Sequence, residues 1–166
     1  PVYHEFIGKF GELLHIDPTG AVIFKVRLAW GRSSLQPVAI PITEKTGICL
    51  MRYSGLHPRR ILSLGTTDGG VTWTSPQKTE LPNPNAAVSG LLLDNGGLLL
   101  VFNNSEDNRK DLSLAYSDDQ GKNWRIIHAF EKETAFSEDH LFSYPCLIRD
   151  GKGIFHLFYT WHKRRI

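Results

Sequence analysis

Carboxylates that could bind a cation lie in two short polar runs, Thr66–Trp73 and Ser117–Trp124, which we call the Asp boxes. Each box places an aspartate, Asp68 or Asp119, two residues before a glycine. A calcium loop of the EF-hand type needs a longer, fixed series of oxygen ligands, which neither box has. The aspartates fit a turn in which a carboxylate accepts hydrogen bonds from nearby backbone N–H groups, so we expect an architectural role.

Metal and disulfide chemistry are not indicated elsewhere in the chain. The two cysteines, Cys49 and Cys146, both lie in apolar stretches, and buried free thiols are favoured over a disulfide. The seven histidines are scattered, and no Cys and His spacing resembles a zinc site. We therefore expect no metal and no other cofactor.

The two Asp boxes are copies of one motif. A single offset of 51 residues relates the aspartate, the glycine and the tryptophan of one box to those of the other: Asp68, Gly70 and Trp73 against Asp119, Gly121 and Trp124. An offset shared by three residue types indicates an internal repeat. The glycine permits a positive φ, and the tryptophan supplies a large ring that anchors the turn.

Short apolar stretches flank the two boxes in the same order. Around the first box they are Pro37–Ile42, Ile48–Tyr53, Ile61–Leu64 and Val71–Ser75. Around the second they are Ala87–Leu93, Leu98–Phe102, Leu112–Tyr116 and Trp124–His128. Four antiparallel strands in each unit of roughly 40–50 residues are typical of a β-propeller blade.

The sequence therefore predicts an all-β protein that forms part of one β-propeller and covers roughly three to four blades. The predicted units are a partial blade at 1–35, two blades with Asp boxes at 36–80 and 86–130, and a partial blade at 143–166. Propellers close with about four to eight blades. We expect the remainder of a longer chain, or a second copy, to complete the ring.

Strand order places the two kinds of connection at opposite ends of the blades. The Asp boxes lie at one end, and longer loops richer in charge and asparagine lie at the other: Ser54–Arg60, Pro76–Ala86, Asn103–Asp111, Glu131–Ser143 and Trp161–Arg165. The innermost strands begin at this second end, at Gln36, at Ala86–Ser89 and at Tyr144. Starts that converge near a propeller axis are a usual place for a ligand.

Polar side chains at this end are candidate ligand contacts with competing interpretations. Gln36 opens an inner strand, where its amide could form a hydrogen bond to a ligand. Asn85 and Asn103 fit either loop capping or sugar binding. Arg109 fits either a surface residue that bonds a loop or contact with a sugar or carboxylate, and Arg164 fits either a solvated run of charge or a ligand contact.

Tyr159 and Trp161 alternate on one predicted strand and so share a face. One of these aromatic rings could stack on a sugar, or both could pack between blades.

Overall composition excludes several classes of partner. The 166 residues carry a formal net charge of +2, which indicates no nucleic-acid binding. No apolar run is long enough to span a membrane as a helix. The N-terminal residues do not resemble a signal peptide.

The Asp boxes and the stretch 142–161 together resemble the sialidase (neuraminidase) superfamily. Closer similarity to bacterial sialidase-like proteins built of Asp-box, or BNR, repeats lies in Asn83–Asn85, Leu100–Asn104, Tyr144-Pro145 and Tyr159–Ile166. The resemblance covers about residues 35–166. It implies a six-bladed propeller, a glycan substrate and a secreted or periplasmic location.

Tyr144 matches the nucleophile of these sialidases. The anomeric carbon of sialic acid bears a carboxylate that would repel an anionic nucleophile, whereas a neutral phenol avoids the repulsion and needs a nearby base. Glu138 or Asp139, in the loop entering the same blade, could be that base. The implied activity is that of an exo-α-sialidase in the complete protein, with this chain alone inactive.

The sequence also departs from the family pattern. The glutamate expected near the start of the preceding inner strand is absent from Ala86–Gly90, and Asn103-Asn104 stand where an arginine is often found. Arg52, Arg59, Arg109 and Arg164 could supply positive charge, but none matches a family arginine. The alternatives are therefore a non-catalytic carbohydrate-binding or scaffold propeller and related chemistry on a different acidic sugar.

Overall fold

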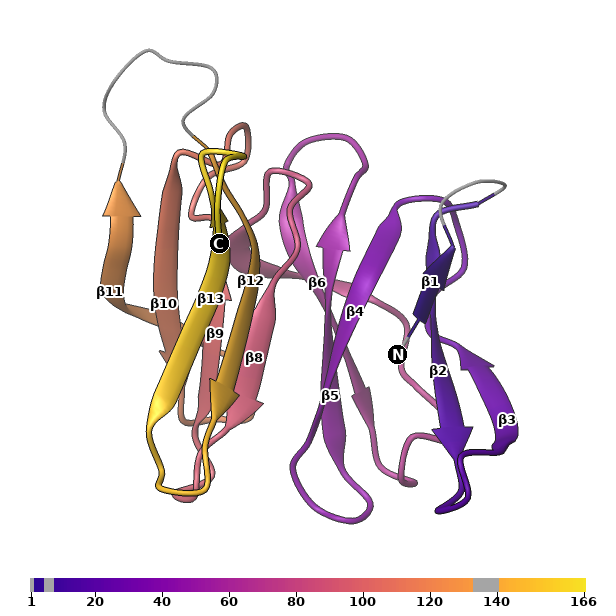
Figure 1. Ribbon diagram of the computed structural model, residues 1–166. Helices are drawn as coiled ribbons and strands as arrows, with labels where there is room; N and C mark the ends of the chain where they lie inside the picture. Colours follow the sequence, from indigo (N-terminus) through magenta and orange to yellow (C-terminus); the bar gives the residue numbers. More distant parts are fainter. Residues whose placement is uncertain (1, 5–7, 133–140) are drawn as a thin grey trace.

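The computed structural model describes residues 2–4, 8–132 and 141–166, which form antiparallel β-sheets (Figure 1). The first sheet contains β1 (Val2–His4), β2 (Phe10–Ile16) and β3 (Val22–Arg27). The second contains β4 (Ser34–Pro41), β5 (Gly47–Tyr53), β6 (Arg60–Thr66) and β7 (Gln77–Pro82). The third contains β8 (Ser89–Leu92), β9 (Leu98–Phe102), β10 (Asp111–Ser117) and β11 (Arg125–Lys132). The fourth contains β12 (Phe142–Arg149) and β13 (Phe155–Trp161).

The four sheets stand side by side, and each has an apolar boundary with the next (Figure 1). Between the second and third sheets, Ile40 and Leu50 pack with Leu98, Leu100 and Phe102. Both faces of the third sheet are covered at its interior strand β9, all five residues of which are buried. The predicted all-β class and propeller-type sheets are confirmed.

A second boundary lies between the first two sheets, where Cys49 and Met51 pack with Leu28 and Leu13. A third lies between the last two sheets, where Val101 and Leu112 pack with Phe142 and Leu147. The core is thus divided into layers between sheets, which is how repeated blades bury apolar surface.

The Asp boxes form nearly identical turns. In the first box, Thr66 Oγ1 donates a hydrogen bond to Asp68 Oδ1 (2.9 Å), and the Gly70 amide donates to Thr66 Oγ1 (3.0 Å). The Thr72 amide also donates to Asp68 Oδ1 (2.9 Å), and Trp73 Nε1 donates to the Gly70 carbonyl (3.1 Å).

The second box repeats this pattern with Ser117, Asp119, Gly121, Asn123 and Trp124. The predicted acceptance of backbone N–H groups by the two aspartates is therefore confirmed.

Each Asp box also contacts the preceding sheet. Gly70 lies against Leu13 and His15 of β2, and His15 Nε2 is 3.0 Å from the Gly70 carbonyl oxygen. Gly121, at φ 82°, lies so close to Ile48 of β5 that a Cβ there would stand 2.5 Å from the isoleucine Cδ1. The glycine serves both the left-handed backbone and the close approach between sheets.

The fourth strand of the second sheet begins later than predicted. The sequence indicated Val71–Ser75, but β7 spans Gln77–Pro82, so most of the predicted loop Pro76–Ala86 is strand. The hydrogen bonds of the Asp box continue through Thr72 and Trp73, and the Thr74 amide donates to the Gly65 carbonyl. The Thr74 amide thus bonds to β6, but the Gly65 amide donates to Thr74 Oγ1 instead of to a carbonyl of the incoming strand, so regular pairing with β6 starts only at Gln77.

The cysteines are both free, but only Cys49 is buried as predicted. Cys146 is exposed because side chains alternate along β12, and Tyr144, Cys146 and Ile148 share the exposed side. Pro145 and Leu147 take the buried side. An apolar stretch in the sequence does not reveal which of its alternate positions will be covered.

Acid should weaken the Asp boxes in a defined pH range. Hydrogen bonds from Asn123 lower the pKa of Asp119 to about 2, so its stabilising effect is complete above its ordinary pKa and is lost as pH falls toward 2. We expect Asp119→Ala to lower Tm by several degrees at pH 7 and by less near pH 2.

Thermal unfolding followed by circular dichroism across this pH range checks the prediction. Asp118→Asn is the matched control, since Asp118 is an exposed neighbour outside the bonds that define the turn. Equal losses for the two variants would contradict the proposed role of Asp119.

Candidate functional site

Three residues have an uncommon backbone conformation. Each lies near the start of an inner strand, β4, β8 or β12. Gln36 has φ 48°, Asn85 has φ 56° and Tyr144 has φ 53°. Gln36 and Tyr144 each precede a proline and coincide with a shift in strand register. A positive φ in residues other than glycine costs energy and persists where the surrounding structure holds it, often at functional sites.

Arg52, from β5, joins the first two of these strand starts. Its Nε donates a hydrogen bond to Asn85 Oδ1 (2.5 Å), and its Nη1 donates to Gln36 Oε1 (2.7 Å). One guanidinium therefore bridges the second and third sheets at the end opposite the Asp boxes.

Arg109, from the loop between β9 and β10, joins the next pair. Its Nη2 donates to the Asn85 carbonyl oxygen (2.6 Å), and its Nη1 donates to Ser143 Oγ (3.2 Å). The guanidinium carbon lies 6.0 Å from the centre of the Tyr144 ring, at the limit of a cation–π contact. The start of β8 is thereby connected to the start of β12.

The resulting site, which we call the arginine-linked site, comprises Gln36, Arg52, Asn85, Arg109 and Tyr144. The structure brings together four residues named from the sequence, Gln36, Asn85, Arg109 and Tyr144, and adds specific bonds for Arg52. Tyr144 is 56 % exposed, so its ring is accessible. Glu138 and Asp139, the candidate bases, lie outside the described residues.

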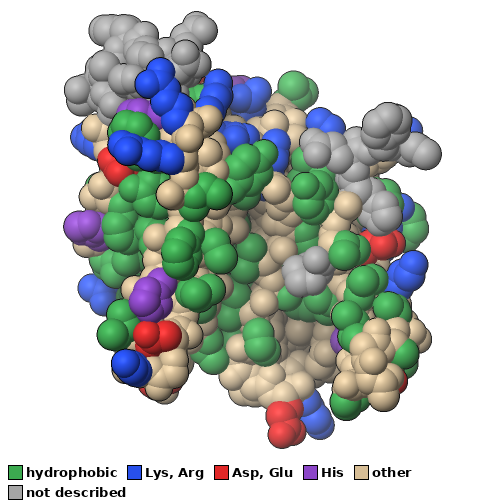
Figure 2. All heavy atoms as spheres, viewed as in Figure 1, with side chains coloured by type: hydrophobic (Ala, Val, Ile, Leu, Met, Phe, Trp, Pro, Cys, Tyr) green, Lys and Arg blue, Asp and Glu red, His purple; other side chains and the backbone are tan. Residues whose placement is uncertain are grey.

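Positive charge gathers at this end of the molecule. Figure 2 shows Lys and Arg side chains along the end at which β4, β8 and β12 begin, whereas the opposite end carries both acidic and basic side chains. Arg52 and Arg109 each carry a permanent charge at the site itself. The electrostatics favour an anionic ligand.

Three other candidate residues have contacts elsewhere. Asn103 is fully buried, and its Nδ2 donates to the carbonyl oxygens of Asp111 (2.5 Å) and Phe142 (3.2 Å), as expected of a loop-capping asparagine. Tyr159 donates a hydrogen bond to Glu131 (2.5 Å). Arg164 is exposed in the turn after β13.

Tyr159 makes packing contacts although it is only partly buried. Its ring meets Phe142 edge-on, with 6.1 Å between ring centres, and burial beside Glu131 raises its pKa to about 12. The hydrogen bond joins β13 to β11 of the neighbouring sheet. These contacts fit the alternative in which Tyr159 and Trp161 pack between blades, as both belong to the apolar cluster between those sheets.

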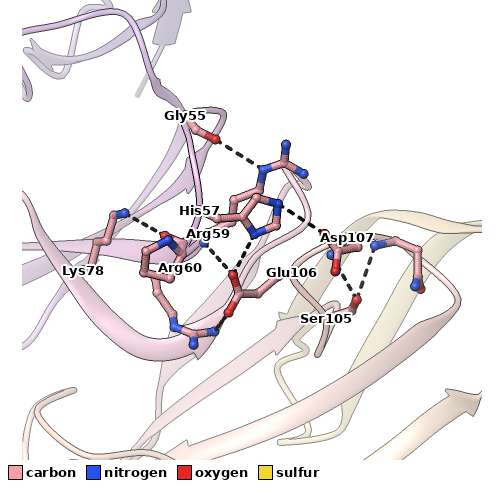
Figure 3. Close-up of polar contacts among 10 residues, drawn as sticks. Gly55, His57, Arg59, Arg60, Lys78, Ser105, Glu106 and Asp107 are labelled. Carbon is pink, nitrogen blue, oxygen red and sulfur yellow. Dashed lines mark hydrogen bonds and ion pairs between the residues drawn. The ribbon is translucent and has the colours of Figure 1, made fainter.

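Two loops beside the site are joined by one carboxylate (Figure 3). Glu106 accepts hydrogen bonds from the Arg59 amide (2.8 Å) and His57 Nδ1 (3.1 Å), and its other oxygen pairs with Arg60 Nη1 (2.6 Å). These bonds lower the pKa of Glu106, with the Arg59 amide as the largest cause. The loop that carries Arg109 is thus fastened to the loop between β5 and β6.

Sequence reasoning missed the bridging role of Arg52 and the contact of Ser143. One signal was present: a polar residue followed by proline opens two inner strands, at Gln36-Pro37 and Tyr144-Pro145. That recurrence marks equivalent positions, but it cannot show which arginine reaches between them.

Among the described residues, no cluster of three or more His, Cys, Asp or Glu side chains is arranged to hold a metal ion. The same portion of the chain contains no helix long and apolar enough to cross a membrane.

The sheet topology is that of a portion of a sialidase-type β-propeller. The chain belongs to the BNR repeat-like domain family, whose profile matches residues 1–157. No curated protein sequence matches it.

Solved structures with the same fold include two from sialidase-type proteins. A variant of the NanB sialidase from Streptococcus pneumoniae aligns with a TM-score of 0.69 and 13% identity, over 93% of this chain and 24% of its own. A leech intramolecular trans-sialidase with 2,7-anhydro-Neu5Ac aligns with a TM-score of 0.70 and 15% identity, over 95% of this chain and 25% of its own. The chain therefore spans about a quarter of the length of these structures.

Removal of Glu106 should loosen the loops beside the site. In Glu106→Ala the Arg59 amide and Arg60 lose a shared acceptor, so we expect a lower Tm and faster hydrogen exchange at the Arg59 amide. Asp107→Asn is the control because Asp107 is exposed and its carboxylate pairs with His57 rather than with Arg59 or Arg60. Unchanged exchange at Arg59 in the alanine variant would contradict the proposed fastening.

Asp111 should make stability fall as pH rises. Burial raises its pKa to about 6, so the folded protein retains this proton over a range in which the unfolded chain has released it. We expect the stability of the wild type relative to Asp111→Asn to decrease between about pH 4 and pH 6, then level off. Urea unfolding midpoints of both proteins at each pH measure this, and a constant difference would refute it.

Proposed function

We propose that the arginine-linked site binds an acidic glycan and that Tyr144 is the nucleophile of a sialidase-type glycoside hydrolase once the propeller is complete. The observation that carries the proposal is the placement of Tyr144. Its phenol is more than half exposed, its backbone is held at φ 53°, and the Arg109 guanidinium lies over its ring.

The charge of the site supports this substrate class. A sugar carboxylate would be attracted by the positive charges of two guanidinium groups, Arg52 and Arg109, at the site. A neutral tyrosine can attack a carbon beside that carboxylate without the repulsion that an aspartate or glutamate would experience. In this scheme the phenol oxygen bonds to the anomeric carbon as the glycosidic bond breaks. Glu138 accepts the phenolic proton, and the departing aglycone oxygen takes a proton from water.

The fold relatives are consistent with the proposal. One is called a sialidase, and another is a trans-sialidase holding 2,7-anhydro-Neu5Ac.

A second function is a non-catalytic glycan-binding propeller, and one observation favours it. Ala86, Ala87 and Val88 stand where a glutamate partner of the tyrosine would be expected, and all three side chains are buried. The arginines and amides of the site could then bind an acidic glycan without cleaving it.

Hydrolysis by the complete protein distinguishes the two functions. We expect release of the fluorophore from a fluorogenic sialoside, and Tyr144→Phe should reduce the rate to background because the nucleophilic oxygen is removed. Tyr159→Phe is the matched control, since that phenol is bonded to Glu131 away from the site.

Binding of a sialoside without hydrolysis in the wild type would favour the non-catalytic function. Equal activity of wild type and Tyr144→Phe would exclude Tyr144 as the nucleophile.

A further inference from the structure

We propose that Arg52 is a positioning residue that fixes the side-chain amides of Gln36 and Asn85 so that only their NH2 groups remain for a ligand. The pair then forms a donor-only subsite, selective for an oxygen that carries no hydrogen, as in a carboxylate or a carbonyl group. The inference rests on the proposed function in taking an acidic sugar as the ligand.

The orientation of both amides follows from the chemistry of arginine. A guanidinium has five N–H donors and no acceptor, so each amide must turn its oxygen toward it. Arg52 Nε reaches Asn85 Oδ1 and Arg52 Nη1 reaches Gln36 Oε1. Rotating either amide by half a turn would place NH2 against N–H and leave two donors facing each other.

The backbone around the two amides is also held. Gln36 and Asn85 both have positive φ, and the Asn85 carbonyl oxygen accepts a hydrogen bond from Arg109 Nη2. The side chains are therefore ordered before a ligand arrives, which lowers the entropy lost on binding.

The NH2 groups are the unused ends of this arrangement. Within the described part of the chain, Gln36 Nε2 and Asn85 Nδ2 donate to no protein acceptor, and both residues are half-buried. A ligand oxygen without hydrogen can accept from these groups at no cost to itself. A hydroxyl can accept too, but its own hydrogen finds no acceptor on these two amides.

Three sugars test this selectivity: the methyl glycoside of N-acetylneuraminic acid, its methyl ester, and the analogue with a primary alcohol in place of the carboxylate. The ester and the alcohol are both uncharged. The ratio of their dissociation constants therefore reports the direction of hydrogen bonding and not the loss of charge when Arg52 is replaced.

Isothermal titration calorimetry of the complete protein with each sugar gives the dissociation constants, and from them the ester-to-alcohol ratio. We expect the ester to bind about fivefold more tightly than the alcohol, the equivalent of about 1 kcal/mol for one net hydrogen bond. In Arg52→Met the amides can turn over, and the ratio should fall to about one. Arg52→Lys keeps a charged donor and should restore part of the preference.

If the Arg52 variants are unstable, Gln36→Glu provides a second test of the inference. The carboxylate still accepts from Arg52 but offers a ligand no N–H group, so binding of the acid and the ester should weaken while that of the alcohol is retained. Side-chain NH2 resonances give a direct readout. Those of Gln36 and Asn85 should shift on addition of the acid, whereas that of Asn123, bonded to Asp119 in the distant Asp box, should not.

The inference would be overturned if folded Arg52→Met had the same ester-to-alcohol ratio as the wild type. It would also be overturned if Gln36→Glu preferred the ester to the alcohol as strongly as the wild type does. Hydrolysis of a sialoside accompanied by such an unchanged ratio would overturn the inference alone. Absence of both hydrolysis and binding of all three sugars would overturn the proposed function and this inference together.

Discussion

Contact between neighbouring sheets is the constraint on which the rest of this structure depends. A four-stranded sheet such as β8–β11 has two faces to bury and cannot do so by itself. Leu100 and Phe102 pack toward the second sheet, while Val101 packs toward the fourth. Alternation along a single strand, β9, thus joins three sheets, and the buried apolar surface holds them side by side.

Polar contacts supplement this apolar packing at both ends. At one end each Asp box brings a glycine against the preceding sheet, as Gly121 does against Ile48. At the other end Arg52 and Arg109 connect successive inner-strand starts through Asn85. The two ends have different chemistry. The Asp boxes satisfy their own donors and acceptors locally, whereas the arginine-linked site leaves amide N–H groups and a phenol exposed.

This difference explains why one end is a better candidate for recognition than the other. In each Asp box the carboxylate oxygens of Asp68 or Asp119 already accept local hydrogen bonds, which lower the pKa of the aspartate to about 2. At the inner-strand starts, the backbone strain at Gln36, Asn85 and Tyr144 is maintained by neighbouring sheets. Strain imposed by tertiary contacts is well suited to holding side chains ready for a ligand.

The sequence by itself determined the repeated turn, the number of strands around it and the end at which the inner strands begin. These features are local: Asp68 and Asp119 bind atoms within four residues of themselves, so spacing alone reveals them. The fourth strand of the second sheet was misplaced because its start depends on pairing with β6 beyond the turn. Only the tertiary structure decided that Cys146 is exposed and that Arg52 connects Gln36 with Asn85, since these outcomes depend on which sheet face is covered and on contacts between residues 16 and 33 positions apart.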